Sequence, residues 1–194
     1  MKINSTRFGE LVINQEDIIR FKEGILGFEQ YKNFIVHDPN DSTLILWLQS
    51  TEATHIAFPI IEPQIFKNDY CPMLMPSDMN SLELLSPNDS KVYTILTIPA
   101  DFTLMSSNLK APLIINLKKN IAKQVVLQDN KLTVKHEMYK ELKLAISSFN
   151  ASDDLKRTAA APIKSFNPDL TPDLNNETES AANLKNIDFE SEAE

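Results

Sequence analysis

The chain has 194 residues, with 19 basic and 27 acidic side chains, three glycines, three histidines and one cysteine. The net charge of −8 argues against a protein that binds nucleic acid directly through a basic surface, and the scarcity of glycine excludes a glycine-rich phosphate loop. One cysteine and three well-separated histidines give neither a disulfide framework nor a metal-ligand spacing, so we predict no metal and no cofactor. No apolar run has the length of a signal peptide or a membrane span, which favours a soluble, cytoplasmic protein.

Short β-strands dominate the pattern of residues 1–150. Each is a run of five to eight residues rich in Val, Ile, Leu, Phe and Thr, bounded by turn residues such as Asp38-Pro39 and Pro87-Asn88. Short turns and no long helix separate these runs, so the pattern indicates a mainly β fold, an antiparallel sandwich or barrel. The predicted strands are Asp17–Phe21, Asn33–His37, Thr43–Gln49, His55–Ile61, Lys91–Ile98, Ala111–Leu117 and Ala122–Gln128.

Helix is a minor component of the prediction. Residues Ser77–Leu85 are expected to form a short helix, because Ser77 and Asp78 are good N-caps. A second helix is expected after the last strand, where apolar residues recur at helical spacing. Those residues are Met138, Leu142, Ala145, Ile146 and Phe149.

The composition changes near residue 150. Residues 151–194 carry 4 basic and 10 acidic side chains and contain no Trp, Tyr, Val, Met, Cys or Gly. Such a segment buries too little apolar surface to offset the entropy lost on ordering, so we predict a folded domain of residues 1–150 and a disordered acidic tail. Two roles stay open for the tail: a solubilising segment that makes no contact, or an acidic arm that raises the encounter rate with a basic partner. Its proline-free part, Leu184–Phe189, could then dock as a short motif in a groove of that partner.

No group of residues in the sequence points to catalysis. The acidic residues between Glu10 and Glu29 are typical of a solvated strand edge. Cys71 lies between Tyr70 and Pro72 with no histidine nearby to activate it, and Trp47 stands within an apolar run that is typical of a core. We therefore predict a binding protein that has no catalytic residues and is not an enzyme.

Three stretches, taken together, resemble one family. They are FKEGILGFEQY at 21–31, LWLQS at 46–50, and NLKAPLIIN at 108–116 followed by AKQVVL at 122–127. In this order and spacing they resemble the flagellar assembly factor FliW family, over about Lys2 to Leu142. The resemblance implies a small antiparallel β-barrel-like domain without enzymatic activity, monomeric when free. It also implies two partners: flagellin, bound in the cytoplasm before export, and CsrA, a dimeric RNA-binding repressor of flagellin translation.

Polar and aromatic residues of these stretches are the candidate partner contacts. Gln49 and Ser50 end a strand, where they either satisfy loose backbone groups or face a partner. Lys110 stands in a loop that enters a strand, where it is either a solvated cation or a contact. The complete set of candidates is Phe28, Glu29, Gln49, Ser50, Asn108, Lys110 and Pro112.

Two other functions compete with the family's function at this stage. A small-ligand or carbohydrate-binding β-barrel needs exposed aromatic residues, but the aromatic fraction is 8% and most of these residues lie in apolar runs. A binder of single-stranded nucleic acid needs a basic groove with stacking aromatics, which the acidic balance disfavours.

Overall fold

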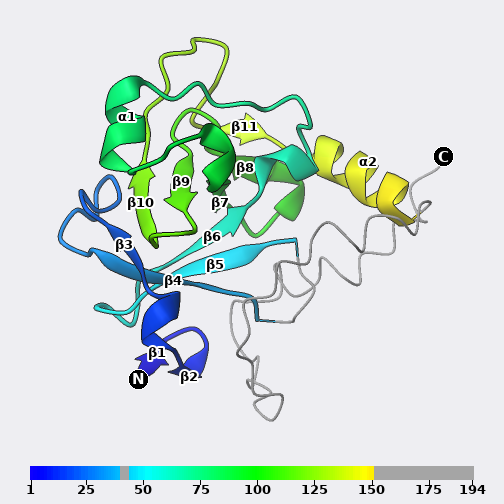
Figure 1. The fold of residues 1–194 in the computed structure, drawn as a ribbon. Helices are drawn as coiled ribbons and strands as arrows, with labels where there is room; N and C mark the ends of the chain where they lie inside the picture. Colours follow the sequence, from blue (N-terminus) through cyan, green and yellow to red (C-terminus); the bar gives the residue numbers. More distant parts are fainter. Residues whose placement is uncertain (40–43, 151–194) are drawn as a thin grey trace.

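Seven β-strands close into a barrel in the computed structural model, which describes residues 1–39 and 44–150 (Figure 1). The barrel closes because β7 pairs with both β6 and β9, and β10 pairs with β3. The predicted tail and Thr43 lie outside the described residues. The barrel strands are β3 (Ile19–Phe21), β4 (Asn33–His37), β5 (Leu46–Ser50), β6 (Ala57–Ile61), β7 (Ser90–Thr97), β9 (Leu113–Asn116) and β10 (Ile121–Gln124).

The prediction of a mainly β, antiparallel barrel is confirmed for every neighbouring pair of barrel strands except one. Strands β10 and β3 are parallel, with Ile121 opposite Arg20 and Ala122 opposite Phe21. A closed ring with an odd number of strands cannot alternate in direction all the way round, so a seven-stranded ring requires a parallel pair. The parallel pair has a consequence for function, because it places the ends of β3 and β10 at the same end of the barrel.

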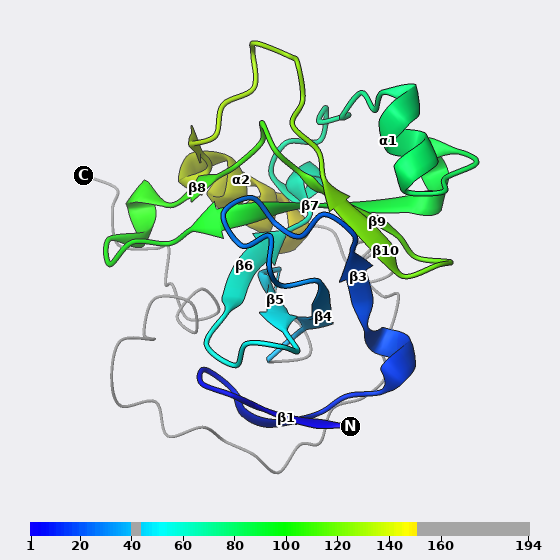
Figure 2. The same ribbon diagram turned by 90° about the vertical axis from the view of Figure 1, so that its left-hand side faces the viewer.

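Elements outside the barrel cover it on several sides (Figure 2). A two-stranded hairpin, β1 (Lys2–Ser5) and β2 (Gly9–Val12), precedes it, and β8 (Ser106–Ser107) and β11 (His136–Glu137) extend the sheet beyond β7. The prediction omitted these four strands, which are two to four residues long. Among the described residues, the helices are α1 (Pro76–Ser81) and α2 (Tyr139–Asn150). The 3₁₀ turns there are η1 (Gln15–Asp17), η2 (Pro63–Ile65), η3 (Pro87–Asp89) and η4 (Phe102–Leu104).

Predicted and observed element bounds agree to within a few residues. Strand β4 coincides with its prediction, Asn33–His37. Helix α1 ends at Ser81, earlier than the predicted Leu85, because Glu83 has a left-handed backbone conformation (φ 53°) that cannot continue a helix.

Side chains that alternate along the strands build an inner and an outer core, and a smaller third cluster packs Ile35 of β4 against Ile3 and Ile13. All seven barrel strands send apolar side chains into the interior, where Phe21, Phe34, Leu48 and Ile60 are fully buried. Outward-facing side chains such as Ile61 and Ile114 pack against α1, α2 and the long loops in the outer core. The barrel interior is therefore filled by its own side chains.

Candidate partner-binding site at one end of the barrel

The topology brings all seven candidate residues to one end of the barrel. The end of β3, the start of β4, the end of β5 and the start of β9 meet there, because neighbouring strands in this part of the ring are antiparallel. The end of β10 joins them through the parallel β10–β3 pair. The loop of residues 22–32 between β3 and β4 crosses this end (dark blue in Figure 2).

This loop contains a tight turn at residues 25–28. Ile25 and Phe28 form a β-bridge, with the Phe28 N–H donating to the Ile25 carbonyl at 2.7 Å. The Ile25 side chain is buried in the barrel core, and the Phe28 ring packs edge-on against Phe58 at 5.0 Å between centroids. The loop therefore covers this end of the barrel, and the side chains of Ile25 and Phe28 hold it in place.

The two glycines of the loop are required for different reasons. Both have left-handed backbones, with φ of 81° at Gly24 and 82° at Gly27. A Cβ atom on Gly24 would lie 2.6 Å from the Glu29 Cα atom, whereas nothing lies within 4 Å of the corresponding position on Gly27. Gly24 therefore permits both the turn and a close backbone approach, and Gly27 permits the turn alone.

The tip of the loop presents one apolar side chain to solvent. Leu26 is 55% exposed, while its N–H donates to the Gln124 side chain at 3.0 Å. The Glu29 carboxylate accepts a hydrogen bond from the Gly27 N–H at 2.8 Å, and this bond lowers the pKa of Glu29. Leu26 is thus held outward by a loop whose own polar groups are satisfied.

Gln124 connects this loop to the second candidate segment. Its Nε2 donates to the Ala111 carbonyl at 3.1 Å, and the Ala111 N–H donates to the Asn108 side chain at 3.0 Å. A chain of hydrogen bonds therefore runs from Leu26 through Gln124 to Asn108. Val126, two residues beyond Gln124, is 50% exposed and adds a second apolar side chain to the same end.

Lys110 fixes the loop that follows β10. Its Nζ donates to the Asp129 carbonyl at 2.5 Å, and its backbone N–H donates to the Thr133 carbonyl at 3.1 Å. The Lys110 side chain is half-buried, so it keeps part of its surface in solvent. Together with Leu26, Glu29 and Asn108, it makes a mixed apolar and polar surface of the kind that docks another protein.

Comparison with known proteins identifies the family. A sequence model described as FliW protein matches residues 2–138, most of the chain. The chain belongs to the FliW family. The resemblance carried by the loop of residues 21–31 and its two companion stretches is thereby confirmed.

Relatives of this FliW-family chain align with it over most of their own length. The flagellar assembly factor FliW of Bdellovibrio bacteriovorus is 43% identical over 143 residues, which cover 73% of this chain and 81% of that one. The flagellar assembly factor FliW of Thermoanaerobacter pseudethanolicus is 39% identical over 149 residues, covering 76% and 99%. A crystal structure of the flagellar assembly factor FliW matches with a TM-score of 0.66 at 33% identity, covering 71% of this chain and 96% of that chain.

Three of the candidate residues lie inside the FliW fold. The Gln49 amide is fully buried and donates to the carbonyls of Ser50 at 2.9 Å and Ile56 at 3.1 Å. The Ser50 hydroxyl accepts from the Ala53 N–H at 3.1 Å, and Pro112 is buried beside Val125. Of the two roles open for Gln49 and Ser50, the structure supports hydrogen bonding to backbone groups. The side chains of Gln49, Ser50 and Pro112 are all buried.

The sequence-based candidates omitted Leu26, Gln124 and Val126. The sequence did contain a signal for Leu26, because Ile25 and Leu26 stand between two glycines. In a tight turn of this kind, one of two adjacent side chains points inward and the other points to solvent. Gln124 carries no such signal, because its role depends on a bond to Leu26, which is 98 residues away in sequence and meets it only in the folded chain.

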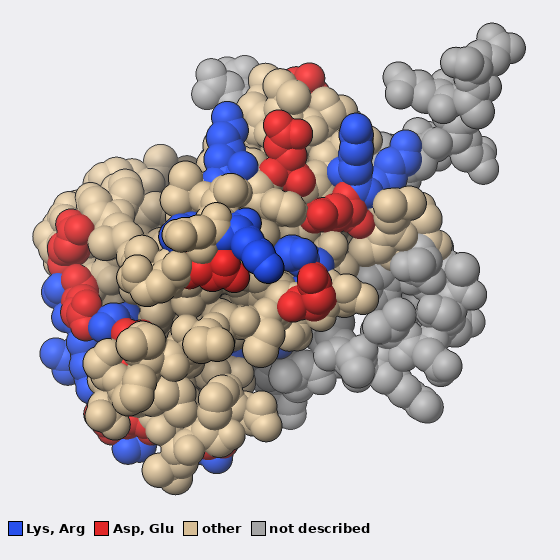
Figure 3. All heavy atoms as spheres, turned by 90° about the horizontal axis from the view of Figure 1, so that it is seen from above, with Lys and Arg blue, Asp and Glu red and all other residues tan. Residues whose placement is uncertain are grey.

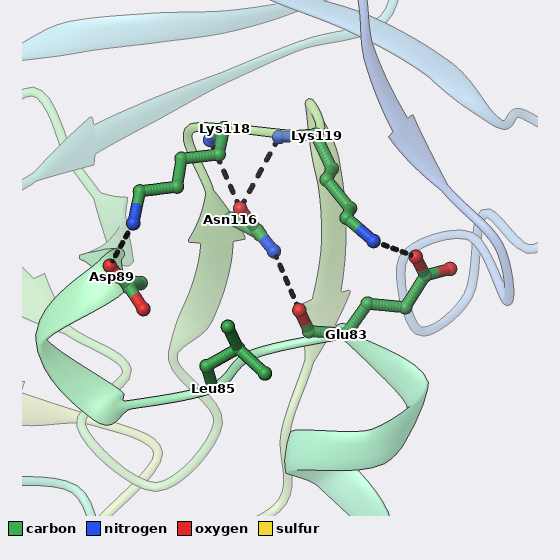
Figure 4. Close-up of a pocket in the computed structure, with 6 residues that line it drawn as sticks. All are labelled: Glu83, Leu85, Asp89, Asn116, Lys118 and Lys119. Carbon is green, nitrogen blue, oxygen red and sulfur yellow. Dashed lines mark hydrogen bonds and ion pairs between the residues drawn. The ribbon is translucent and has the colours of Figure 1, made fainter.

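Ion pairs and a small hollow lie at the β9–β10 turn (Figure 4). This turn is at the other end of β9 and β10 from the candidate residues. Glu83 lies 2.7 Å from Lys119 and 2.9 Å from Lys22, and the two hydrogen bonds from these lysines lower the pKa of Glu83 to about 2. The hollow beside them has a volume of about 140 Å³, below the roughly 300–1,000 Å³ of typical ligand sites. Within residues 1–39 and 44–150, neither this hollow nor the filled barrel interior supports a small-ligand barrel.

Charges of both signs are interspersed over the upper face of the molecule (Figure 3). In the part of the chain that the structure describes, seven lysines form ion pairs with carboxylates. Within residues 1–39 and 44–150, no three His, Cys, Asp or Glu side chains are grouped so as to hold a metal ion. Over the same residues, no helix has the length and apolar character needed to cross a membrane.

Proposed function

We propose that this chain binds flagellin and the translational repressor CsrA in the cytoplasm, and that it relieves repression of flagellin synthesis when flagellin leaves. The observation that carries the proposal is the family match over residues 2–138, together with relatives described as flagellar assembly factors along nearly their whole length. The chain acts by binding and performs no catalysis.

The barrel end supplies the contact surface in this proposal. Leu26 is an apolar anchor on a preorganised loop, so little conformational entropy is lost when a partner covers it. Glu29, Asn108 and Lys110 provide the polar rim around it. Phe28 holds the loop from within, through its contact with Phe58.

Partner switching then follows from linkage. Two ligands that exclude one another each weaken the apparent affinity of the other, so free flagellin keeps CsrA unbound and exported flagellin releases the site. The acidic balance of the chain suits a basic RNA-binding partner, because opposite fields raise the association rate. That rate should fall as salt rises, since fields are screened over about 8 Å at 0.15 M ionic strength.

A calorimetric titration tests the proposal. Full chain is titrated with purified flagellin and with CsrA from the same host, and then CsrA is titrated into the flagellin complex. We expect both partners to bind separately, and bound flagellin to weaken the CsrA affinity by at least tenfold. No binding of either partner, or an unchanged CsrA affinity at saturating flagellin, would refute the proposed function.

Two matched variants locate the surface. Leu26→Ser removes the anchor at the barrel end, and Leu85→Ser removes a leucine that is 96% exposed beside α1. We expect Leu26→Ser to weaken binding of at least one partner by about tenfold or more, the range of a buried interface anchor. Leu85→Ser should bind as the unaltered chain does. Equal affinities for both variants would place the contact elsewhere.

A further inference from the structure

Lysines without a carboxylate partner gather on one side of the molecule. Lys131 and Lys135 lie exposed in the loop before β11, and Lys140 lies exposed in the first turn of α2. Within residues 1–39 and 44–150, none of these three forms an ion pair, in contrast to the seven paired lysines elsewhere. We call Lys110, Lys131, Lys135 and Lys140 the lysine surface.

Contacts within the fold hold the lysine surface together. Lys110 binds the Asp129 and Thr133 carbonyls, which fixes the loop that carries Lys131 and Lys135. His136 Nε2 lies 2.7 Å from Glu141 Oε2, so β11 and the first turn of α2 lie side by side. Along residues 129–143 the chain carries four lysines and three acids, Asp129, Glu137 and Glu141, and Lys110 adds a fifth cation.

Apolar side chains accompany these charges. Val134 stands between Thr133 and Lys135 and is 66% exposed. Leu144 is 72% exposed and lies one helical turn after Lys140, on the same outward face of α2. The surface therefore offers cations interleaved with exposed apolar groups.

The end of the tail has the complementary pattern. Residues 184–194 read LKNIDFESEAE, with three apolar side chains followed closely by alternating acids. The apolar residues are Leu184, Ile187 and Phe189, and the acids are Asp188, Glu190, Glu192 and Glu194. Relatives that this chain covers over 97% and 99% of their length lack room for such a segment, so it is additional to the common fold.

We propose that residues 184–194 dock on the lysine surface of the same molecule. The acids pair with the lysines, and the apolar side chains cover Val134 and Leu144. Docking covers Lys110 as well, so the segment competes for part of the barrel-end site. This last consequence rests on the proposed function, whereas the docking itself does not.

The lengths of chain involved permit this docking. Helix α2 has 12 residues, so its start lies about 18 Å from its end at 1.5 Å per residue. Residues 151–183 separate α2 from the docking segment, and a flexible chain of that length spans roughly 30 Å. A tether that matches its span gives an effective concentration of about 1 mM, at which a motif with a Kd of about 0.1 mM is docked in roughly nine molecules of ten.

A spin label on the tail tests the proposal in the full chain. Cys71, which is exposed, is replaced by Ser, and Ser191→Cys then carries a nitroxide. We expect amide NMR signals of residues 131–135 and 140 to lose at least half of their intensity relative to the reduced label. Signals of the β1–β2 hairpin should be unaffected, because the hairpin lies on the opposite side of the barrel in both ribbon views (Figures 1 and 2).

Charge-matched variants decide between docking and nonspecific attraction. Lys131→Gln, Lys135→Gln and Lys140→Gln together should abolish the broadening, as should 1 M salt, at which the screening length falls to about 3 Å. Lys2→Gln, Lys67→Gln and Lys118→Gln make the same charge change at paired lysines and should leave it intact.

Three results would overturn the proposal. The first is broadening spread evenly over the surface, and the second is equal broadening in both triple variants. The third is broadening that appears when spin-labelled chain without ¹⁵N is mixed with ¹⁵N chain that carries no spin label. The last would assign the segment to a second copy. None of these measurements involves flagellin or CsrA, so their failure is distinct from failure of the proposed function.

Discussion

Gly24→Ala and Gly27→Ala are a matched pair that tests the account of the barrel-end loop. Both glycines are followed by loop residues of the same turn and have almost the same φ, 81° and 82°. They differ in surroundings: a Cβ atom on Gly24 would meet the Glu29 backbone at 2.6–2.9 Å, and one on Gly27 would meet open space. The pair therefore separates backbone strain from steric overlap.

Backbone strain and steric overlap set the expected loss in the free energy of unfolding for each variant. Placing an L-residue in the left-handed region costs about 1–2 kcal/mol, which is the whole effect expected for Gly27→Ala. Gly24→Ala adds an overlap with backbone atoms that cannot rotate away, and overpacking of this kind costs about 1–3 kcal/mol more. We therefore expect losses of about 1–2 kcal/mol for Gly27→Ala and about 2–5 kcal/mol for Gly24→Ala.

Urea unfolding followed by circular dichroism, with thermal unfolding as a second measure, checks this prediction. In a domain of this size each kcal/mol lowers Tm by about 2–4 °C, so the two variants should differ by several degrees. Fluorescence of the buried Trp47 follows the same transition. Equal destabilisation of the two variants would refute the argument from the close approach at Gly24.

Three further predictions concern other parts of the fold. Gln49→Leu should cost about 2–4 kcal/mol, because it removes buried hydrogen bonds to Ser5 and to backbone carbonyls, and urea unfolding measures the loss. Glu83 has a folded pKa of about 2 against an ordinary 4.5, so its stabilising effect is present above pH 4.5 and disappears as the pH falls towards 2. The stability difference between the unaltered chain and Glu83→Gln should shrink over that range in pH-dependent unfolding. In a gel-shift assay, the purified chain should retard no flagellin leader RNA, and a shifted band would contradict the prediction of no direct nucleic-acid binding.

Much of the barrel could be predicted from the sequence, because its strands are runs of apolar residues long enough to show a pattern. β4 at Asn33–His37 is bounded by polar residues and turns on both sides, and its limits were predicted as observed. β8 and β11 contain two residues each, and no periodicity can be detected over that length. The parallel β10–β3 pair follows from the odd number of strands, which is fixed only once the ring is closed.

The candidate site was only partly predictable, for a different reason. Local sequence shows which residues end strands or occupy turns, but not which of their side chains face inward. Gln49 and Ser50 are the last two residues of β5, and their side chains bond backbone groups of the adjacent β5–β6 loop. Leu26 faces outward because Ile25 faces inward, and that choice depends on how the loop meets the barrel interior.

Truncations on either side of α2 test where the folded domain ends. We expect residues 1–150 alone to keep the circular dichroism spectrum and cooperative unfolding of the full chain. The FliW model matches residues 2–138, and relatives covered over 97% and 99% of their length align over only 143 and 149 residues. Residues 1–137 alone should fail to fold. That truncation removes Met138 and Leu142, whose exposed fractions in the outer core are 0% and 2%.

The expected contrast is large. Loss of one such buried side chain costs about 2–5 kcal/mol, so losing both approaches the 5–15 kcal/mol stability of a typical domain. It also exposes Met105 and the apolar surface beneath the helix. If residues 1–150 lost the native spectrum, the boundary predicted near residue 150 would be wrong. If residues 1–137 unfolded cooperatively at the same midpoint as the full chain, α2 would be a surface attachment and not a part of the core.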